Sequence, residues 1–295
     1  MITIKLKGGL GNQMFQYALG RKLAQKHGTT LALDVAFLND RTPRKDVIFR
    51  NFDLDIFKLD PSVKIVNMPH YIDPVSKIAK LFFILKLKLD KNYIKEKYFQ
   101  FDPAILDVPD GSYLDGQWTS EKYFSDIGDI IRREFLFKEA LLPISEDLAR
   151  VIASENSVCV NIRRADFVAN KITATFHGVM DEEYFSKAMK IMENALTTAP
   201  HFFVFSDDIE WCKKNITSQF PVTFVDHSHK GVKFGNYLHL MTLCKHFIIP
   251  NSTFGWWAAW LSTSDPQKKV IAPKQWFADP KVDTRDVIPS TWTRL

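Results

Sequence analysis

In the second half of this chain of 295 residues, short unbroken apolar runs alternate with helical patterns. The apolar runs predict strands near residues 158–162, 202–205, 222–225, 247–249 and 269–271. Helical patterns separate several of these runs, near residues 181–196, 237–245 and 254–261. Strands without a polar face are typical of a parallel sheet that helices cover on both faces. The pattern therefore predicts an α/β fold.

The chain begins with the same kind of unit. An apolar strand pattern over residues 2–6 is followed by Gly8-Gly9-Leu10-Gly11-Asn12, a helical pattern over 13–27 and a strand pattern over 30–34. Glycines at a strand-to-helix turn leave backbone N–H groups uncovered, so that an anionic or sugar ligand can approach a helix N-terminus. The spacing differs from the dinucleotide fingerprint. The alternative is a tight turn in which the glycines serve backbone geometry alone.

Composition sets the remaining bounds. A formal charge of +5 is mild and no nucleic-acid-binding motif is present, which argues against a nucleic-acid partner. The three cysteines show no metal spacing, and they predict unpaired thiols in a reducing compartment. Met1 leads directly into the first strand pattern, and no apolar run approaches the roughly 18 residues of a spanning helix. We expect a soluble, cytoplasmic protein.

The segment 77–97 is basic. Its apolar residues fit one helical face, namely Ile78, Leu81, Phe82, Leu85 and Leu89. Alternating leucines and lysines over 85–89 also fit a strand. If helical, the segment is either a surface helix with solvated lysines or a helix that lies on an anionic bilayer.

Polar groups follow three of the predicted strands, where ligands of parallel sheets bind. The first is Asn161-Ile162-Arg163-Arg164-Ala165-Asp166. Charges that leave a buried strand are costly unless they are paired or bind something, and an arginine fork suits a diphosphate. The alternative is a structural network between arginines and Asp166.

The other two groups are Ser206-Asp207-Asp208 and Asn251-Ser252-Thr253. The acids can accept hydrogen bonds from a ribose or a base edge, and the second group can donate to phosphate at a helix start. For both, the alternative is a simple helix cap. Trp256 and Trp257, which follow, are predicted core residues.

Together these blocks resemble one family, the bacterial α-1,2-fucosyltransferases, which are inverting glycosyltransferases of family 11 that use GDP-fucose. The similarity covers residues 8–18, 161–166, 205–208 and 248–261, in the family's order, and more loosely 176–179. The resemblance implies GT-B architecture, in which two Rossmann-like domains with parallel sheets face each other. We expect an acceptor-side α/β domain over 1–148 and a nucleotide-sugar-binding domain over 149–295.

The resemblance also implies residue roles. Arg163 matches the arginine that binds the donor diphosphate and stabilises the leaving GDP, with Arg164 and Asp166 in support. The catalytic base is Asp166, His177 or a relay through solvent. Donor binding is implied for a set of glycines, polar and aromatic residues: Gly9, Gly11, Asn12, Asn161, Arg164, Asp207, Asp208, Tyr237, Ser252, Thr253 and Phe254.

Two positions depart from the family pattern. Asn161 stands where the family has histidine, and Tyr237 stands where it has aspartate. An aspartate can accept two hydrogen bonds from a guanine edge, whereas a tyrosine cannot do so equivalently. Either other residues such as Asp207 or Asp208 hold guanine, or the donor base differs.

No metal or cofactor is expected, because the resembled family needs none. Asp53-Leu54-Asp55 matches a metal-binding pattern but falls in an irregular segment, and His227-Ser228-His229 lacks a clear third ligand.

The sequence thus predicts transfer of L-fucose from GDP-β-L-fucose to O-2 of a terminal β-galactoside in O-antigen assembly. The acceptor would be an oligosaccharide or a lipid-linked glycan, with peripheral contact at the cytoplasmic face of the inner membrane. Two alternatives remain open. One is a transferase of the same fold with another nucleotide-deoxysugar donor, such as a dTDP- or UDP-sugar. The other is a catalytically silent nucleotide-binding homologue.

Overall fold

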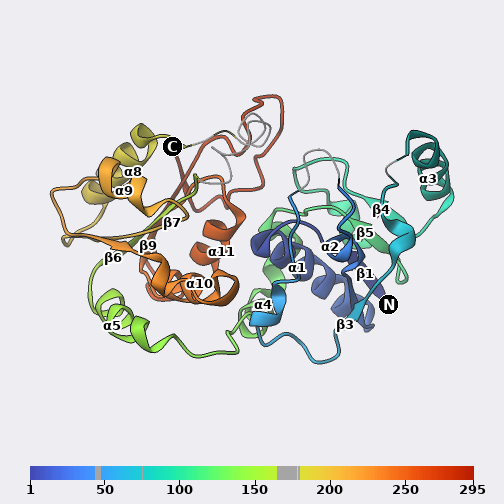
Figure 1. Cartoon of the computed structure of the whole chain (residues 1–295), viewed down its shortest axis with the longest axis horizontal. Helices are drawn as coiled ribbons and strands as arrows, with labels where there is room; N and C mark the ends of the chain where they lie inside the picture. The colour runs from blue at the N-terminus through green and yellow to red at the C-terminus, as the bar shows by residue number, and fades with distance from the viewer. Residues whose placement is uncertain (44–47, 75, 165–177, 179) are drawn as a thin grey trace. The chain divides into compact units, whose positions relative to one another are not determined.

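The computed structural model describes residues 1–43, 48–74, 76–164, 178 and 180–295. It divides into two compact units (Figure 1). Unit 1 comprises Met1–Leu136 and Arg285–Val287, and unit 2 comprises Phe137–Thr284 and Ile288–Leu295. The structure changes from unit 1 to unit 2 after Leu136, which is earlier in the chain than the predicted boundary at residue 148. Segment 137–148 belongs to unit 2, where the backbone N–H of Leu142 donates to Asn236 Oδ1 at 2.9 Å.

Unit 1 is built on a sheet whose strands are all parallel. Within the described residues the sheet has five strands, in the order β3-β2-β1-β5-β4. Its strands are β1 (Ile2–Lys5), β2 (Leu31–Asp34), β3 (Lys64–Val66), β4 (Tyr93–Lys95) and β5 (Tyr113–Asp115). Its helices are α1 (Leu10–His27), α2 (Ala36–Asn39), α3 (Lys77–Leu89) and α4 (Gly128–Glu134). The chain order changes direction between β1 and β5, which makes that point the switch point of the sheet.

Unit 2 has a second parallel sheet, in the order β11-β10-β9-β6-β7-β8 for the described residues. Its strands are β6 (Ser157–Ile162), β7 (His201–Ser206), β8 (Val222–Val225), β9 (His246–Ile248), β10 (Val270–Ala272) and β11 (Thr293–Arg294). Its helices are α5 (Glu146–Ser154), α8 (Glu182–Ala195), α9 (Ile209–Asn215), α10 (Gly235–Thr242) and α11 (Thr253–Leu261).

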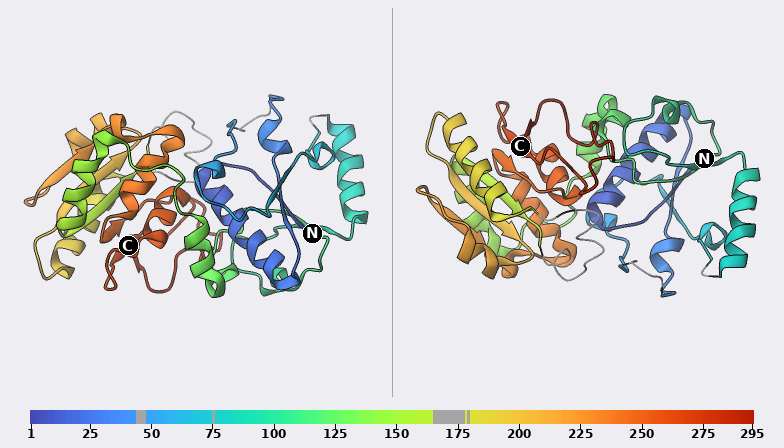
Figure 2. Two further views of the ribbon diagram at one scale, coloured as in Figure 1. Left: turned by 90° about the horizontal axis from the view of Figure 1, so that it is seen from below. Right: turned by 90° about the horizontal axis from the view of Figure 1, so that it is seen from above.

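Helices cover both faces of the unit 2 sheet, as Figure 2 also shows. On one face, Val160 and Val204 belong to a buried cluster with Phe185 of α8. On the opposite face, the ring of Phe205 meets that of Tyr237 in α10, with 5.5 Å between centroids. Alternate residues of a strand point to opposite faces, so apolar residues are required throughout. This explains the unbroken apolar runs, and the predicted α/β class with two Rossmann-like units on parallel sheets, as in the GT-B type, is confirmed.

In unit 1, helix α1 packs closely against the sheet at Gly20. A Cβ atom added at this glycine would lie 2.6 Å from Leu31 Cδ1 and 2.7 Å from Ile4 Cγ1. The absence of a side chain at Gly20 therefore sets how near α1 lies to β1 and β2. The two tryptophans predicted as core, Trp256 and Trp257, are fully buried in unit 2.

The structure also defines the secondary structure of two further parts of unit 1. Between β2 and α3, the described residues include helix α2 and the largely exposed edge strand β3. The segment 77–89, ambiguous between helix and strand, is helical. Among the described residues, no helix combines the length and the apolar character needed to cross a membrane.

Candidate functional site

The ends of strands β6 and β7 bring one arginine and one aspartate of unit 2 together. The backbone N–H of Arg164 donates to Asp207 Oδ1 at 2.8 Å. The guanidinium of Arg164 lies over the ring of Trp211, 3.9 Å from its centroid. Stacking on a ring leaves the in-plane N–H groups of a guanidinium able to donate to an anionic oxygen. Nε of Arg164 is buried and has no hydrogen-bond partner in the described part of the chain. Arg163 directly precedes this pair and is half-buried.

Asn161, at the position where the resembled family has histidine, is buried near the end of β6. Its Nδ2 donates to the carbonyl of Phe205 at 3.4 Å. Its Oδ1 is buried and finds no hydrogen-bond partner in the described part of the chain. A Cβ atom at Gly255 of α11 would lie 2.5 Å from that Oδ1. Asn161 therefore lies directly against the first turn of α11.

Two of the predicted donor residues serve helix ends. Asp208 caps α9, since its Oδ1 accepts from the backbone N–H of Trp211 at 3.2 Å. Ser252 occupies the N-cap of α11 without a side-chain cap bond. Its neighbour Asn251 donates from Nδ2 to the carbonyl of Trp276 at 3.1 Å. Asp208 is thus a helix cap, as the alternative interpretation expects. Ser252 remains a predicted phosphate contact, as do Thr253 and Phe254, which follow it in the chain.

Tyr237 lies in the aromatic core beside the ends of β7 and β8. Its hydroxyl donates to the carbonyl of Val225 at 2.7 Å, and burial raises its pKa above the usual value. Its ring contacts the rings of Phe205, His227 and Phe234. The hydroxyl is thus engaged inside unit 2.

Sequence reasoning missed Phe234. This residue and Lys233 both have positive φ angles, 56° and 54°, which non-glycine residues rarely adopt. The Phe234 side chain is nevertheless part-exposed at the end of the aromatic cluster with His227 and Tyr237. Strained backbone of this kind tends to occur at ligand-binding positions. In the sequence, an unusual turn before Phe234 is indicated by Gly231, which also has a positive φ angle.

Asp166 and His177, the two predicted candidates for the base, lie outside the described residues. Of the remaining predicted residues of unit 2, Tyr237 lies in α10, and the others lie at or after the end of β6, after β7 and at the start of α11. Because β9, β6 and β7 are neighbours in the sheet, these groups share one carboxyl edge.

In unit 1, the glycine turn joins β1 to α1. Gly8 has a φ of 80°, which favours glycine, and the carbonyl of Gly9 accepts from the backbone N–H groups of Asn12 and Gln13 at 3.0 and 3.1 Å. Gln13 holds the turn by donating to the Gly8 carbonyl at 2.9 Å. Gly11 is buried in the first turn of α1. Geometry therefore accounts for Gly8, as the alternative interpretation expects.

Gly9 is different. It is the N-cap of α1 with a φ of −77°, and a Cβ atom there would have no atom within 4 Å. Neither backbone conformation nor packing thus requires glycine at this position. The open space beside Gly9, at the carboxyl edge of the unit 1 sheet, suits the approach of a ligand to the backbone.

We expect the Gly9→Ser variant to fold as well as the wild type and to lose activity. Serine is a favoured N-cap residue, so its hydroxyl can bond to the first turn of α1. The same side chain occupies the open space, and a displaced substrate lowers kcat/KM by at least about tenfold. Thermal unfolding and steady-state kinetics test this.

Gly20→Ala is the contrasting variant, since its added methyl group meets Ile4 and Leu31 and should cost about 1–3 kcal/mol of stability. Full activity of Gly9→Ser would show that Gly9 serves backbone geometry alone.

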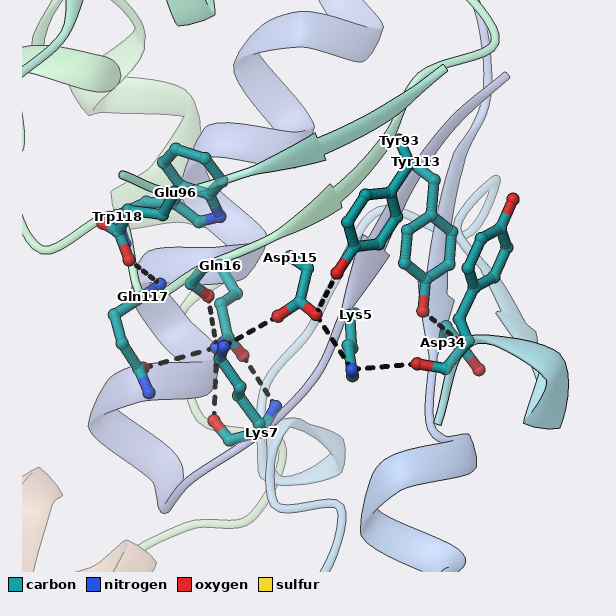
Figure 3. Close-up of polar contacts among 12 residues, drawn as sticks. Lys5, Lys7, Gln16, Asp34, Tyr93, Glu96, Tyr113, Asp115, Gln117 and Trp118 are labelled. Atoms are coloured by element: carbon teal, nitrogen blue, oxygen red, sulfur yellow. Dashed lines mark hydrogen bonds and ion pairs between the residues drawn. The ribbon is translucent and has the colours of Figure 1, made fainter. Parts of the chain in front are cut away.

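A charged network that the sequence did not predict lies at the switch point of the unit 1 sheet (Figure 3). Asp115, at the end of β5, accepts from Lys5 Nζ at 2.9 Å and Lys7 Nζ at 2.7 Å. The hydroxyl of Tyr93 donates to the same carboxylate at 2.7 Å. Burial alone would raise the pKa of Asp115, but the two ammonium groups outweigh it and hold the pKa well below its usual range. Asp115 therefore remains ionised and is a poor general base.

The loop after β5 is held by a second carboxylate. Glu96 accepts from the backbone N–H groups of Gln117 and Trp118 at 2.6 and 2.8 Å. Trp118 has a φ of 57°, so Glu96 stabilises a strained turn. Burial raises the pKa of Glu96. Beside it, Gln16 donates to the Gly116 carbonyl at 3.0 Å.

The part-exposed groups at this edge are Lys7 and Gln117, with Gly8 and Gly9 beside them. Ammonium and amide groups of this kind bind sugar hydroxyls. The available sequence signal was a set of charged residues ending short apolar runs, as in Leu114-Asp115.

Neither weak metal motif forms a centre. Within the described ranges, no group of three His, Cys, Asp or Glu side chains is placed to hold a metal ion. The backbone N–H of Asp53 donates to Gln13 Oε1 at 2.9 Å, which fixes this segment onto α1. His227 Nε2 lies 3.0 Å from the Ser206 carbonyl oxygen.

The whole chain, residues 1–295, matches the family described as Glycosyl transferase family 11. The chain is 33% identical over 301 residues to an α-1,2-colitosyltransferase of Escherichia coli, covering 100% of this chain and 99% of that protein. It is 33% identical over 292 residues to the O-antigen biosynthesis glycosyltransferase WbnK of the same species, covering 92% and 94%. It is 32% identical over 272 residues to human galactoside α-(1,2)-fucosyltransferase 1, covering 89% and 66%.

A parallel-sheet enzyme with arginines at its carboxyl edge and this pattern of similarity is a glycosyltransferase. More narrowly, the chain belongs to glycosyltransferase family 11, as the resemblance predicted.

Proposed function

We propose that this family 11 enzyme transfers L-fucose from GDP-β-L-fucose to O-2 of a terminal β-galactoside of a surface glycan, with inversion at the anomeric carbon. The observation that carries the proposal is the arrangement after β6, where Arg163 and Arg164 leave a buried strand and Asp207 and Trp211 fix Arg164. Two consecutive arginines at the carboxyl edge of a parallel sheet suit a diphosphate.

In the proposed reaction, the 2-oxygen of the acceptor bonds to the anomeric carbon while the bond from that carbon to the β-phosphate oxygen breaks. The electron pair leaves with GDP, where Arg163 neutralises the growing charge. The hydroxyl proton passes to Asp166, His177 or solvent. No metal takes part, because the two arginines supply the positive charge that the leaving group needs.

The donor base is proposed to lie at the aromatic cluster beside β7 and β8. Tyr237 directs its hydroxyl into unit 2, so it does not replace the family's aspartate as an acceptor for guanine. Phe234, part-exposed and held at positive φ, offers a ring on which a base can stack. The second carboxylate oxygens of Asp207 and Asp208 are then the acceptors available for guanine N–H groups.

A second donor, the GDP ester of colitose, is favoured by a specific observation. The chain is 33% identical to an α-1,2-colitosyltransferase over its full length. Colitose is L-fucose without its 3-hydroxyl group, so both donors present the same methyl group and anomeric centre. The two assignments share one linkage and one mechanism.

The acceptor is proposed to bind at the carboxyl edge of unit 1, where Lys7, Gln117 and the backbone of Gly9 are accessible. It is an oligosaccharide or a lipid-linked glycan of O-antigen type. Action on a lipid-linked acceptor would place the enzyme at the cytoplasmic face of the inner membrane.

Two assays on the purified protein test the proposal. Calorimetry with GDP, UDP, dTDP and ADP should show GDP-selective binding that Arg163→Ala weakens. Transfer from GDP-fucose or GDP-colitose to a β-galactoside should then give an α-1,2 product, identified by NMR. Preference for another base would overturn the GDP donor. Nucleotide binding without transfer of either sugar to any β-galactoside would favour a catalytically silent homologue.

A further inference from the structure

Helix α3 (Lys77–Leu89) exposes its apolar side chains. Five large residues form a stripe with spacings of three and four residues, and their exposed fractions are 72% for Ile78, 68% for Leu81, 66% for Phe82, 55% for Leu85 and 74% for Leu89. At about 100° per residue, these positions share one face of the helix. A surface helix normally buries such a face against its own domain. Here the face is directed to solvent, and we call it the α3 stripe.

The helix is attached to unit 1 by its other side. Phe83 is buried and Leu87 is half-buried, and both positions lie roughly opposite the centre of the α3 stripe. Figure 2 shows α3 at the margin of unit 1. The fold thus anchors the helix through Phe83 and leaves the α3 stripe uncovered by the described residues. A contiguous exposed apolar patch of this kind marks an interaction surface.

The charges around the stripe identify the partner. Helix α3 contains lysines at 77, 80, 86 and 88 and no acidic residue. On the helical wheel, position 86 borders one edge of the stripe, and positions 77 and 88 border the other. Lysines at the borders of an apolar face are typical of helices that lie in the interface of an anionic bilayer. The acyl chains accept the apolar stripe while lipid phosphates meet the lysines.

The length and the charge of α3 argue against two other arrangements, a helix that spans the bilayer and a helix that pairs with a second copy of the chain. Thirteen residues extend about 20 Å, which is too short to span a bilayer. Pairing of the stripe with a second copy would bring two basic helices together, and like charges repel.

We propose that α3 is an in-plane membrane anchor that binds anionic phospholipid bilayers through the α3 stripe and its bordering lysines. Because lipid binding requires neither donor nor acceptor, the inference holds whether or not the proposed sugar transfer is correct.

Sedimentation with vesicles tests the anchor directly. The purified full chain is mixed with vesicles of phosphatidylcholine alone, or of phosphatidylcholine with phosphatidylglycerol. We expect binding to the mixed vesicles and much weaker binding to the neutral ones. Leu81→Ser with Phe82→Ser should reduce binding to mixed vesicles by roughly a hundredfold or more, because two buried apolar side chains are lost. Lys86→Glu with Lys88→Glu should reduce it by a similar factor through charge reversal.

Leu136→Ser with Ile144→Ser is the matched control, since both side chains are exposed elsewhere in the chain and their loss should leave vesicle binding unchanged. The side chains of Leu81, Phe82 and Lys86 are exposed, so thermal unfolding of the α3 variants should match that of the wild type. Absence of wild-type binding, or binding unaffected by the Leu81 and Phe82 changes, would overturn the proposal. A concentration-dependent dimer that those changes dissociate, without vesicle binding, would replace it with self-association.

Discussion

Replacement of Asp115 by asparagine is expected to destabilise unit 1 by about 3–5 kcal/mol, as when one partner of a buried ion pair is removed. The side chains of Lys5 and Asp115 are only 5% and 6% exposed, so little water reaches the ammonium that the variant leaves behind. Lys5 retains the Tyr71 carbonyl as an acceptor at 3.0 Å, which does not neutralise its charge. Chemical denaturation monitored by tryptophan fluorescence measures the loss.

The exposed pair between Lys26 and Asp107 supplies the control. Asp107 is largely exposed, so Asp107→Asn should leave the unfolding midpoint essentially unchanged. A double variant, Lys5→Met with Asp115→Leu, should recover much of the lost stability, because the buried charge of Lys5 is removed together with its partner and Lys7, which also loses Asp115, is part-exposed. Equal, small effects of Asp115→Asn and Asp107→Asn would contradict the energetic role of the network.

Because the Asp115 carboxylate titrates, the stability lost in Asp115→Asn should depend on pH. The pKa of Asp115 is lowered in the folded state, so its contribution is fully present above the unfolded value of about 3.9. That contribution is lost as the pH falls from there toward the folded pKa. The stability difference between wild type and Asp115→Asn should therefore be largest near neutral pH and shrink below about pH 4.

Arg163→Lys is expected to lower kcat by about 10²–10³-fold while the protein stays folded. A lysine keeps the positive charge but cannot donate two parallel hydrogen bonds to phosphate oxygens. The loss should therefore appear in the chemical step, where charge develops on the leaving GDP. Single-turnover transfer from GDP-fucose, together with calorimetric binding of GDP, separates that step from donor binding.

Arg150→Lys, on the exposed surface of α5, is the matched substitution and should leave kcat unchanged. An unchanged melting temperature would confirm that Arg163→Lys acts on the reaction. If Arg163→Lys retained the wild-type kcat, the leaving-group role would belong to another residue, with Arg164 the nearest alternative.

The fold of unit 2 was predictable because its strands are buried on both faces of the sheet. Every residue of β6 is buried, so its sequence carries a clear apolar signal. In unit 1 the signal is weaker, since β3, β4 and β5 have three residues each and β3 is largely exposed. Short strands gain their stability from parallel neighbours far along the chain, which a local pattern does not contain.

The candidate site was also only partly predictable from the sequence. The groups after β6 and β7 were found because charges that end an apolar strand are conspicuous, as with Arg164 and Asp207. Asp115 and Glu96 were missed because their partners, Lys5, Lys7 and Gln117, are mostly distant in sequence. For Phe234, its strained φ becomes visible only in three dimensions.

Unit 1 also contains a small piece from near the end of the chain, Arg285–Val287. In that piece, Asp286 accepts from the backbone N–H of Phe101 at 3.0 Å and from Lys122 Nζ at 2.5 Å. During synthesis, residues 1–136 leave the ribosome long before Asp286 exists. The unit that is made first must therefore wait for nearly the whole polypeptide before its last contacts form, and a fragment cut after Leu136 would lack them permanently.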